Sequence, residues 1–195
     1  LTNQAFSLIS ITDSCNPIFK SCVVYNGFIR QDSYDGYRQI IIEKNSAPLF
    51  LRSYFGKDTT AATTTTDMGA QCFFTNARGK IDSCYFYKSM TNVVHNLNSN
   101  IIIRNTEFAK NNGRSILNRS STAFIENCIF NDTTNSVYND YSGGAVANIE
   151  NSNATYIKCQ FNNSYAHRAG GACSNENSIT LMKNCVFTNC KAHLS

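Results

Sequence analysis

The nine cysteines are the side chains of this chain best suited to metal or redox chemistry, but their spacing argues against a metal site. Five of them hold the same place in a repeated phrase and lie at least 26 residues apart. Thiolates a whole repeat apart do not surround one ion tetrahedrally, and the chain has no C-x-x-C pair. We therefore expect no metal and no cofactor. We interpret these five as small buried side chains of a crowded interior: Cys22, Cys84, Cys128, Cys159 and Cys185.

The other four cysteines, Cys15, Cys72, Cys173 and Cys190, fall outside that position. They are the candidates for disulfide bonds if the protein resides in an oxidising compartment. Because the total is odd, at least one thiol stays unpaired within the chain.

Catalytic constellations are not evident. His95, His167 and His193 read as unrelated positions of the repeat, and none has a serine or cysteine nucleophile in register. Asp132 and Asp140, near Arg168, are a conjectural carboxylate pair of the kind that cleaves polysaccharides. We expect no catalytic residue, and we keep a polysaccharide lyase or hydrolase as the alternative.

A short sequence motif occurs seven times, and the fold that it predicts determines where these side chains lie. The motif consists of a small polar or sulfur residue, any residue, and then a large apolar anchor, and successive anchors are 31, 31, 22, 22, 31 and 26 residues apart. Units this short cannot bury their own apolar face, so they predict a solenoid. The copies are Cys22-Val23-Val24, Ser53-Tyr54-Phe55, Cys84-Tyr85-Phe86, Thr106-Glu107-Phe108, Cys128-Ile129-Phe130, Cys159-Gln160-Phe161 and Cys185-Val186-Phe187.

The elements between the anchors read as strands. Apolar residues alternate at period 2, and Asn, Ser, Gly and Thr clusters supply turns. A leucine-rich repeat is the competing solenoid, but its L-x-x-L-x-L ladder is absent. We therefore predict an all-β, right-handed, single-stranded parallel β-helix of about seven coils. A second apolar column lies five residues before the anchors: Phe19, Phe50, Ile81, Ile103, Ile125, Tyr156 and Met182.

One domain covers residues 1–195 in this interpretation, with 1–17 as a partial first coil or cap and 18–195 as repeat coils. The extra residues of the longer coils form loops at 27–37, 58–67 and 132–142. Both ends of the chain fall partway round a coil, and solenoids need caps. We expect the domain to be part of a longer protein or to join end to end with a partner.

The charges predict polar walls rather than a nucleic-acid surface. The net charge is +4, but the basic residues form no run of four and no aromatic stacking motif accompanies them. No continuous apolar segment approaches the roughly 18 residues that a transmembrane helix needs. Four residues before the anchors, Asp82, Arg104 and Glu126 place opposite charges on adjacent coils. One residue later, we expect a ladder of side chains at a turn, formed by Ser21, Ser83, Asn105, Asn127 and Asn184.

The repeats resemble the polymorphic outer-membrane proteins and related right-handed β-helix surface proteins, whose units combine GGA-[ILV] with F-x-x-N. Gly143-Gly144-Ala145-Val146 and Gly170-Gly171-Ala172-Cys173 correspond to the first element, and Phe161-Asn162-Asn163 and Phe187-Thr188-Asn189 depart from the second. The C-x-F-x-N-C-x-A form of Cys185 to Ala192 is similar to the protist members. The resemblance implies a surface or adhesive protein at the cell surface or outside the cell.

The function expected is therefore non-enzymatic: a structural or adhesive β-helix that presents polar walls and loops to a protein or a glycan. Exposed aromatic rings are the expected contact points, and Tyr54 and Tyr85 stack on adjacent coils. Four loop tyrosines are further candidates: Tyr34, Tyr37, Tyr138 and Tyr141.

An intracellular filament or cytoskeletal component, assembled through its coil ends, is a further alternative for the role and location of the protein. The chain also contains four N-x-[ST] sequences, which permit glycosylation of a secreted protein: Asn118, Asn131, Asn153 and Asn162.

Overall fold

The computed structural model describes residues 7–25, 38–56, 70–135 and 143–193, and these residues form strands and turns without a helix. The predicted loops at 27–37 and 58–67 lie outside the described residues. Only residues 132–135 of the third predicted loop are described, and part of that segment is a short strand rather than a loop. Four of the candidate contact residues also lie outside: Tyr34, Tyr37, Tyr138 and Tyr141.

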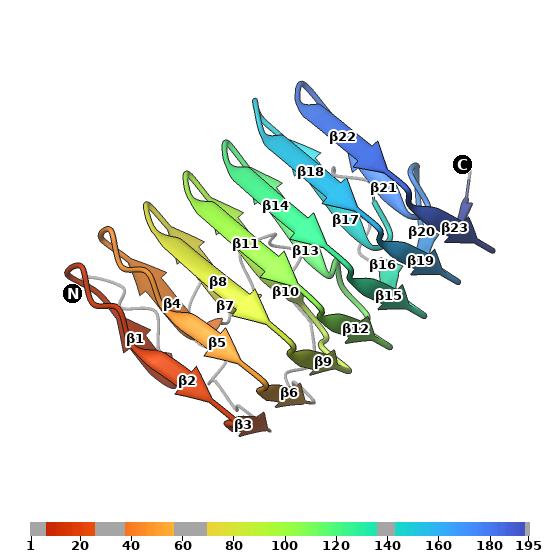
Figure 1. The fold of residues 1–195 in the computed structure, drawn as a ribbon. Coiled ribbons are helices and arrows are strands. Elements are labelled where there is room, and N and C mark those ends of the chain that lie inside the picture. The colour runs from red at the N-terminus through yellow and green to blue at the C-terminus, as the bar shows by residue number, and fades with distance from the viewer. Residues whose placement is uncertain (1–6, 26–37, 57–69, 136–142, 194–195) are drawn as a thin grey trace, which may run out of the picture.

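Three parallel sheets of seven strands each run along the described part of the molecule, and each coil contributes one strand to each sheet (Figure 1). Neighbouring strands follow one another by one coil, with parallel pairing throughout. This architecture confirms the predicted parallel β-helix of about seven coils. A fourth sheet, of three strands, lies beside the last coils.

Sheet A contains β1 (Ile9–Ile11), β4 (Arg38–Glu43), β7 (Ala70–Thr75), β10 (Asn92–Leu97), β13 (Ile116–Arg119), β17 (Val146–Ile149) and β21 (Cys173–Asn175). Sheet B contains β2 (Ile18–Lys20), β5 (Leu49–Leu51), β8 (Arg78–Asp82), β11 (Asn100–Arg104), β14 (Thr122–Glu126), β18 (Asn153–Ile157) and β22 (Ile179–Lys183). Sheet C contains β3 (Val23–Tyr25), β6 (Tyr54–Gly56), β9 (Tyr85–Tyr87), β12 (Glu107–Ala109), β15 (Ile129–Asn131), β19 (Gln160–Asn162) and β23 (Val186–Thr188). Sheet D contains β16 (Thr134–Asn135), β20 (Tyr165–Ala166) and β24 (Lys191–Ala192).

The first coil begins in the segment that the sequence left open as a partial coil or cap. Strand β1 pairs with β4, so Ile9 and Ile11 lie in the same columns as Ile40 and Ile42. Ile11 is buried in the main core cluster. Residues 9–11 therefore belong to the repeat.

The anchors form one continuous column inside the coils, and all of them except Val24 are aromatic. The rings of Phe86, Phe108 and Phe130 have centroids 5.1 and 5.0 Å apart and lie within 6° of parallel. Every one of these rings is fully buried. The remaining members of the column are Val24, Phe55, Phe161 and Phe187, in register by strand pairing.

The corner between sheets B and C explains the small residue of the repeated phrase. The residue before it adopts a left-handed backbone conformation in every coil, with φ between 49° and 56°. The thiol or hydroxyl then donates a hydrogen bond to the carbonyl on the other side of this turn, as from Cys84 to Asp82, from Ser53 to Leu51 and from Thr106 to Arg104. The same carbonyls also accept a backbone N–H from the preceding coil, so the thiol or hydroxyl adds a second hydrogen bond to each of them.

A column of buried amides also runs inside the coils. Asn96 donates from Nδ2 to Oδ1 of Asn118 over 3.2 Å, and Asn118 donates in turn to Oδ1 of Asn148 over 2.7 Å. All three residues are fully buried, and the Tyr156 hydroxyl joins them by donating to Asn148 Oδ1. Each amide thus gains a partner from the next coil, as in other cross-β stacks.

Candidate functional site

A cluster of four tyrosines lies on the outer face of sheet C over the first three coils. Tyr54 and Tyr85 directly precede inward-pointing anchors, and their rings stack with centroids 5.6 Å apart and planes 22° apart. Tyr25 lies 6.5 Å from Tyr54, and Tyr87 lies 6.0 Å from Tyr85. We call Tyr25, Tyr54, Tyr85 and Tyr87 the tyrosine cluster. The sequence interpretation singled out only its two central members.

Gly56 allows the rings to lean across the sheet. A Cβ atom at Gly56 would overlap ring atoms of both Tyr25 and Tyr54. Strand β6 therefore has a glycine where its neighbours β3 and β9 have tyrosines, at the paired positions Tyr25 and Tyr87. The glycine thus leaves the rings of Tyr25 and Tyr54 the space that a side chain at this position would fill.

The phenol groups of the two central tyrosines, Tyr54 and Tyr85, stay uncharged at neutral pH. Partial burial raises the pKa of Tyr54, and the neighbouring phenols of Tyr25 and Tyr87 raise it further. The pKa of Tyr85 is raised by partial burial and by the carboxylate of Glu107. Lys88 places its Nζ atom 5.1 Å from the centroid of the Tyr87 ring. The cluster therefore combines ring surface with hydroxyl groups, flanked among the described residues by one cation and one anion.

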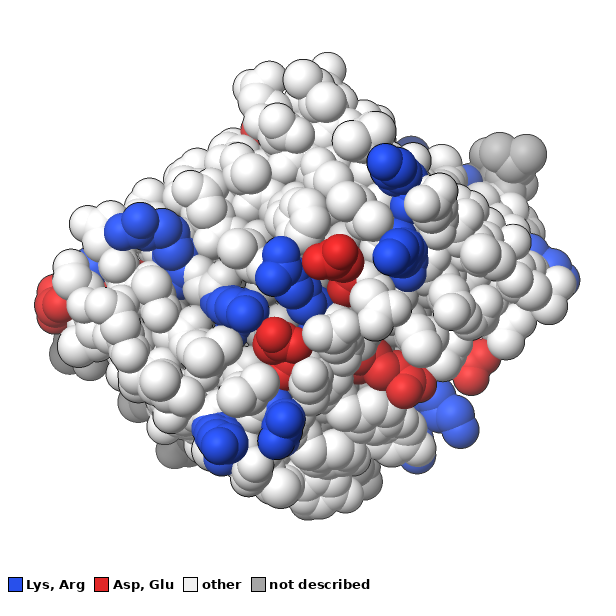
Figure 2. Space-filling model, in the orientation of Figure 1, with Lys and Arg blue, Asp and Glu red and all other residues white. Residues whose placement is uncertain are grey.

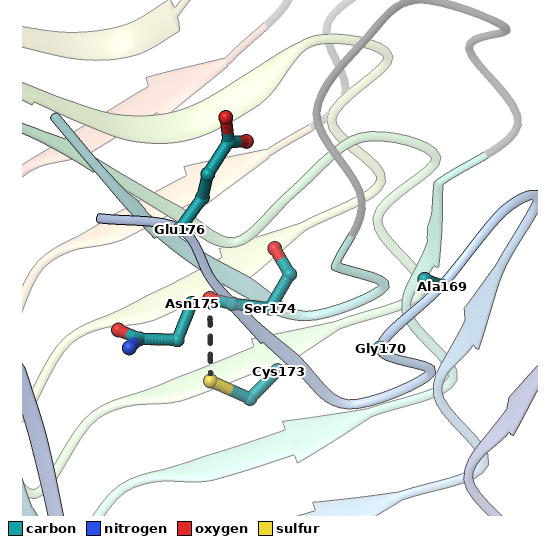
Figure 3. A pocket seen from close by; sticks show the side chains of 6 residues that line it. All are labelled: Ala169, Gly170, Cys173, Ser174, Asn175 and Glu176. Carbon is teal, nitrogen blue, oxygen red and sulfur yellow. Dashed lines mark hydrogen bonds between the residues drawn. The ribbon is translucent and has the colours of Figure 1, made fainter. Parts of the chain in front are cut away.

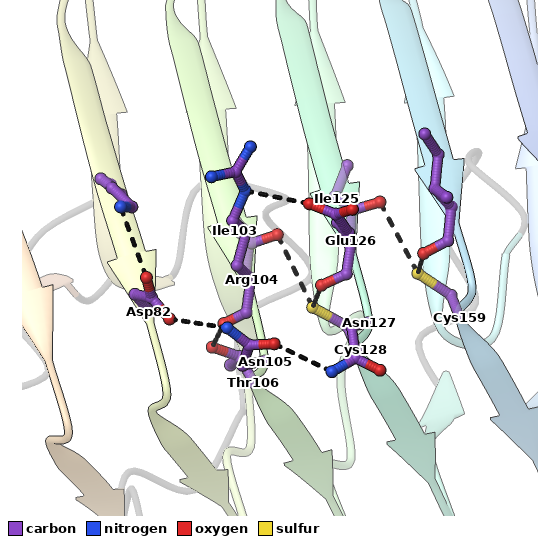
Figure 4. Close-up of polar contacts among 12 residues, drawn as sticks. Asp82, Ile103, Arg104, Asn105, Thr106, Ile125, Glu126, Asn127, Cys128 and Cys159 are labelled. Carbon is purple, nitrogen blue, oxygen red and sulfur yellow. Dashed lines mark hydrogen bonds and ion pairs between the residues drawn. The ribbon is translucent and has the colours of Figure 1, made fainter.

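The wall beside the cluster is a mixed-charge ladder (Figure 4). Arg104 lies in register between Asp82 and Glu126, as the sequence predicted, and forms an ion pair with Glu126 over 3.1 Å. Asp82 instead pairs with Lys80 at 3.4 Å and accepts a hydrogen bond from Asn105 at 3.0 Å. Figure 2 shows basic and acidic side chains interspersed on this face, rather than gathered by sign. Such a wall offers no extended field of one sign to a polyanion.

The predicted ladder at the turn lies beside these charges. Asn127 donates from Nδ2 to Asn105 Oδ1 over 2.8 Å, and Asn105 donates to Asp82. The residues at this turn have positive φ, which asparagine tolerates better than most residues. The ladder thus has a structural role at the corner.

All nine cysteines are free thiols in the structure. Three of the five repeat cysteines, Cys84, Cys128 and Cys159, are buried, and their thiols donate to backbone carbonyls. Burial raises the pKa of the Cys84 and Cys72 thiols. A hydrogen bond with Cys159, together with burial, raises the pKa of the Cys128 thiol. Protonated, buried thiols are poor nucleophiles.

The four cysteines proposed for disulfides are placed by the repeat as well. Cys72 and Cys173 share one column of sheet A, but Val94, Ile116 and Val146 separate them. Four coil steps of roughly 4.8 Å exceed the reach of a disulfide. Cys15 lies in the first coil and Cys190 in the last, where its thiol donates to the carbonyls of Phe161 and Thr188. The structure therefore places neither Cys72 and Cys173 nor Cys15 and Cys190 within reach of a disulfide bond.

Two of the three histidines, His167 and His193, occupy corresponding positions of adjacent coils, whereas the sequence interpretation took all three as unrelated. His167 and His193 directly follow the paired residues Ala166 and Ala192, and their ring centroids are 6.1 Å apart. Each lies six residues after its anchor, Phe161 or Phe187, which is a signal the sequence contained. Among the described residues, no group of three histidines, cysteines or carboxylates could hold a metal ion.

The conjectural carboxylate pair is only partly described. Asp140 lies outside the described residues. Asp132 Oδ1 accepts a hydrogen bond from Asn163 at 2.9 Å, and Asn189 donates to Asn163 in the next coil. Asp132 thus ends a ladder of side chains at a corner of the solenoid.

A hollow of about 300 Å³ lies at the C-terminal end of sheet A (Figure 3). The Cys173 thiol lines it and donates to the carbonyl of Ser174 at 3.6 Å. Burial raises the pKa of this thiol to about 12, so the thiol is protonated at neutral pH. The residues around it are Ala169, Gly170, Cys173, Ser174, Asn175 and Glu176.

The four possible glycosylation sites differ in access. Asn118 is fully buried and belongs to the inner amide column, so the folded coil has no room for a glycan there. Asn131 and Asn162 are half-buried, and Asn162 donates to Asn131 over 2.8 Å. Asn153 is exposed at the start of β18. Among the four sequons, Asn118 is therefore the one whose burial argues against a glycan in the folded protein.

Comparison with known proteins gives no relative: no family model, no curated protein and no solved structure matches the chain. In the described part of the chain, no helix has the length and apolar character needed to cross a bilayer.

Proposed function

We propose that this protein is a non-enzymatic β-helix with a structural or adhesive role, which presents its outer walls to a protein or glycan partner. The observation that supports the proposal is the tyrosine cluster, which sits on a sheet held rigid by pairing with neighbouring coils. Tyrosines bury much contact area at low conformational cost, and they are frequent hot spots of binding sites.

The surface location is part of the proposal. It rests on the resemblance of the glycine elements, and of the segment from Cys185 to Ala192, to β-helix surface proteins. The exposed sequon at Asn153 permits a glycan. The intact mass of the native protein under non-reducing conditions tests it, because the mass reports glycans and disulfides together. A glycan-bearing protein agrees with the proposal, whereas nine reduced thiols and empty sequons favour an intracellular protein.

The absence of catalysis is tested separately. The full chain is incubated with a panel of polysaccharides, and the release of reducing ends or unsaturated products is measured. Products above the level of a heat-denatured control would replace the proposed function with the lyase or hydrolase alternative.

Assembly through coil ends is a second candidate function, and one observation favours it. The Phe187 ring stacks on Phe161 at 4.9 Å on one side, yet it is 49% exposed. A further coil, from the same polypeptide or from another, would cover its free face. Sedimentation of the full chain over a range of concentrations tests this candidate: growth into long particles supports it, and a constant monomer mass opposes it.

A further inference from the structure

The tyrosine cluster leaves parts of its ring faces uncovered. Carbon atoms of two stacked rings approach to about 3.5 to 4.0 Å. The centroids of Tyr54 and Tyr85 are 5.6 Å apart, although their planes differ by only 22°. The rings must therefore be displaced sideways, so part of each face is not covered by the other ring. The same reasoning holds for Tyr85 and Tyr87, at 6.0 Å and 19°.

Within the described residues, the charge around the cluster is balanced. The described charged side chains that act on it are Lys88, near the Tyr87 ring, and Glu107, one coil beyond Tyr85. A cation and an anion on its margins attract neither a polyanion nor a polycation strongly. The phenol groups provide both donors and acceptors of hydrogen bonds.

The size of the cluster suits a small ligand. It spans three coils, each roughly 4.8 Å from the next, so its extent along the solenoid is roughly 10 Å. A stable protein interface needs about 800 Å² from each partner, much more than four partly exposed rings supply. A few linked rings of a linear ligand, by contrast, match this length.

We propose that the tyrosine cluster binds a neutral oligosaccharide. The hydrogen-rich faces of the sugar rings lie on the uncovered parts of the tyrosine rings, and the sugar hydroxyls exchange hydrogen bonds with the phenol groups. Gly56 keeps the platform open, because any side chain there would displace the rings of Tyr25 and Tyr54. This inference rests on the proposed function as a binding scaffold and names the ligand class of one of its walls.

Tyrosine fluorescence provides a direct test, because the chain contains ten tyrosines and no tryptophan. The full chain is titrated with the tetrasaccharides of cellulose, chitin, xylan, mannan and starch. Three variants accompany it: Tyr85→Ala removes a central ring, Tyr85→Phe keeps the ring without its hydroxyl, and Tyr165→Ala removes a ring from sheet D. Far-ultraviolet dichroism verifies that each variant retains its fold.

We expect saturable binding of at least one tetrasaccharide. Tyr85→Ala should lower the affinity for this tetrasaccharide at least tenfold, and Tyr85→Phe should lower it less. Tyr165→Ala should leave the affinity unchanged. No binding to any member of the panel, or equal binding by Tyr85→Ala and the unaltered chain, overturns the inference. Tyr85-dependent binding of a protein alone would also overturn it, while the proposed function would stand. Cleavage of the bound tetrasaccharide would instead overturn the proposed function.

Discussion

The thiol of Cys84 donates a hydrogen bond to the backbone carbonyl of Asp82, 3.4 Å away, across the left-handed residue Ser83. Because Thr106 makes the equivalent bond one coil later, we predict that Cys84→Thr folds normally. The valine of Cys84→Val has nearly the same shape as threonine but no hydrogen-bond donor. It should be less stable than Cys84→Thr by about 1 kcal/mol in urea unfolding. Equal stability of the two variants would show that the corner hydrogen bond contributes little.

The aromatic column gives the largest expected loss of stability. Phe108 lies between Phe86 and Phe130 and is fully buried. Phe108→Ala should lower the free energy of unfolding by about 3 to 5 kcal/mol, because it leaves a cavity between two rings. The adjacent residue Glu107 points outward, and Glu107→Ala should change stability by less than about 0.5 kcal/mol. Similar losses for the two variants would contradict the stacked column.

Glycan occupancy should follow burial rather than sequence. After expression in a eukaryotic secretory host, peptide mass spectrometry should find a glycan at Asn153 and none at Asn118 in the folded protein. Asn118 is buried and bonded to Asn148, whereas Asn153 is exposed. A folded, monomeric species that carries a glycan on Asn118 would contradict the inward orientation of this column.

Acid should weaken the wall of sheet B through Asp82. Burial opposes its ionisation, but hydrogen bonds from Asn105, Ser83 and Lys80 outweigh burial and hold its pKa below the ordinary value. The ionised carboxylate therefore stabilises the fold at pH values above its pKa in the unfolded chain, which is about 3.9. This contribution is lost as the pH falls through the lower pKa of the folded protein.

Urea unfolding at neutral pH and at about pH 3 tests this linkage. Asp82→Asn should be less stable than the unaltered chain at neutral pH, and the difference should shrink in acid. Asn105→Gly keeps the left-handed turn and removes one donor, so it should show part of the same effect. A difference between Asp82→Asn and the unaltered chain that does not change with pH would contradict the role of this carboxylate.

The sequence predicted those parts of the structure that repeat with the anchors. Phe86, Phe108 and Phe130 stack because their spacing equals one coil, and the turns before them recur in the same register. Tyr25 and Tyr87 were missed, although each lies one residue after an anchor and must point outward with Tyr54 and Tyr85. The period of 2 within each strand carried this signal.

The buried amides were harder to predict. Asparagine is typical of turns and surfaces, so Asn118 read as a possible glycan acceptor. Its amide is buried because Asn96 and Asn148 occupy the same column in adjacent coils and satisfy it. Single-residue preferences cannot reveal such mutual satisfaction, because it depends on three coils at once.

The claim that the outer wall holds a ligand without altering it is tested most directly by calorimetry followed by recovery of the ligand. The full chain and a Tyr54→Ala, Tyr85→Ala double variant are titrated with the tetrasaccharide that binds best, and the sugar is then sized by mass spectrometry. We expect saturable heat for the unaltered chain only and a sugar of unchanged mass. Shortened sugar, or equal heat from the double variant, would contradict the account.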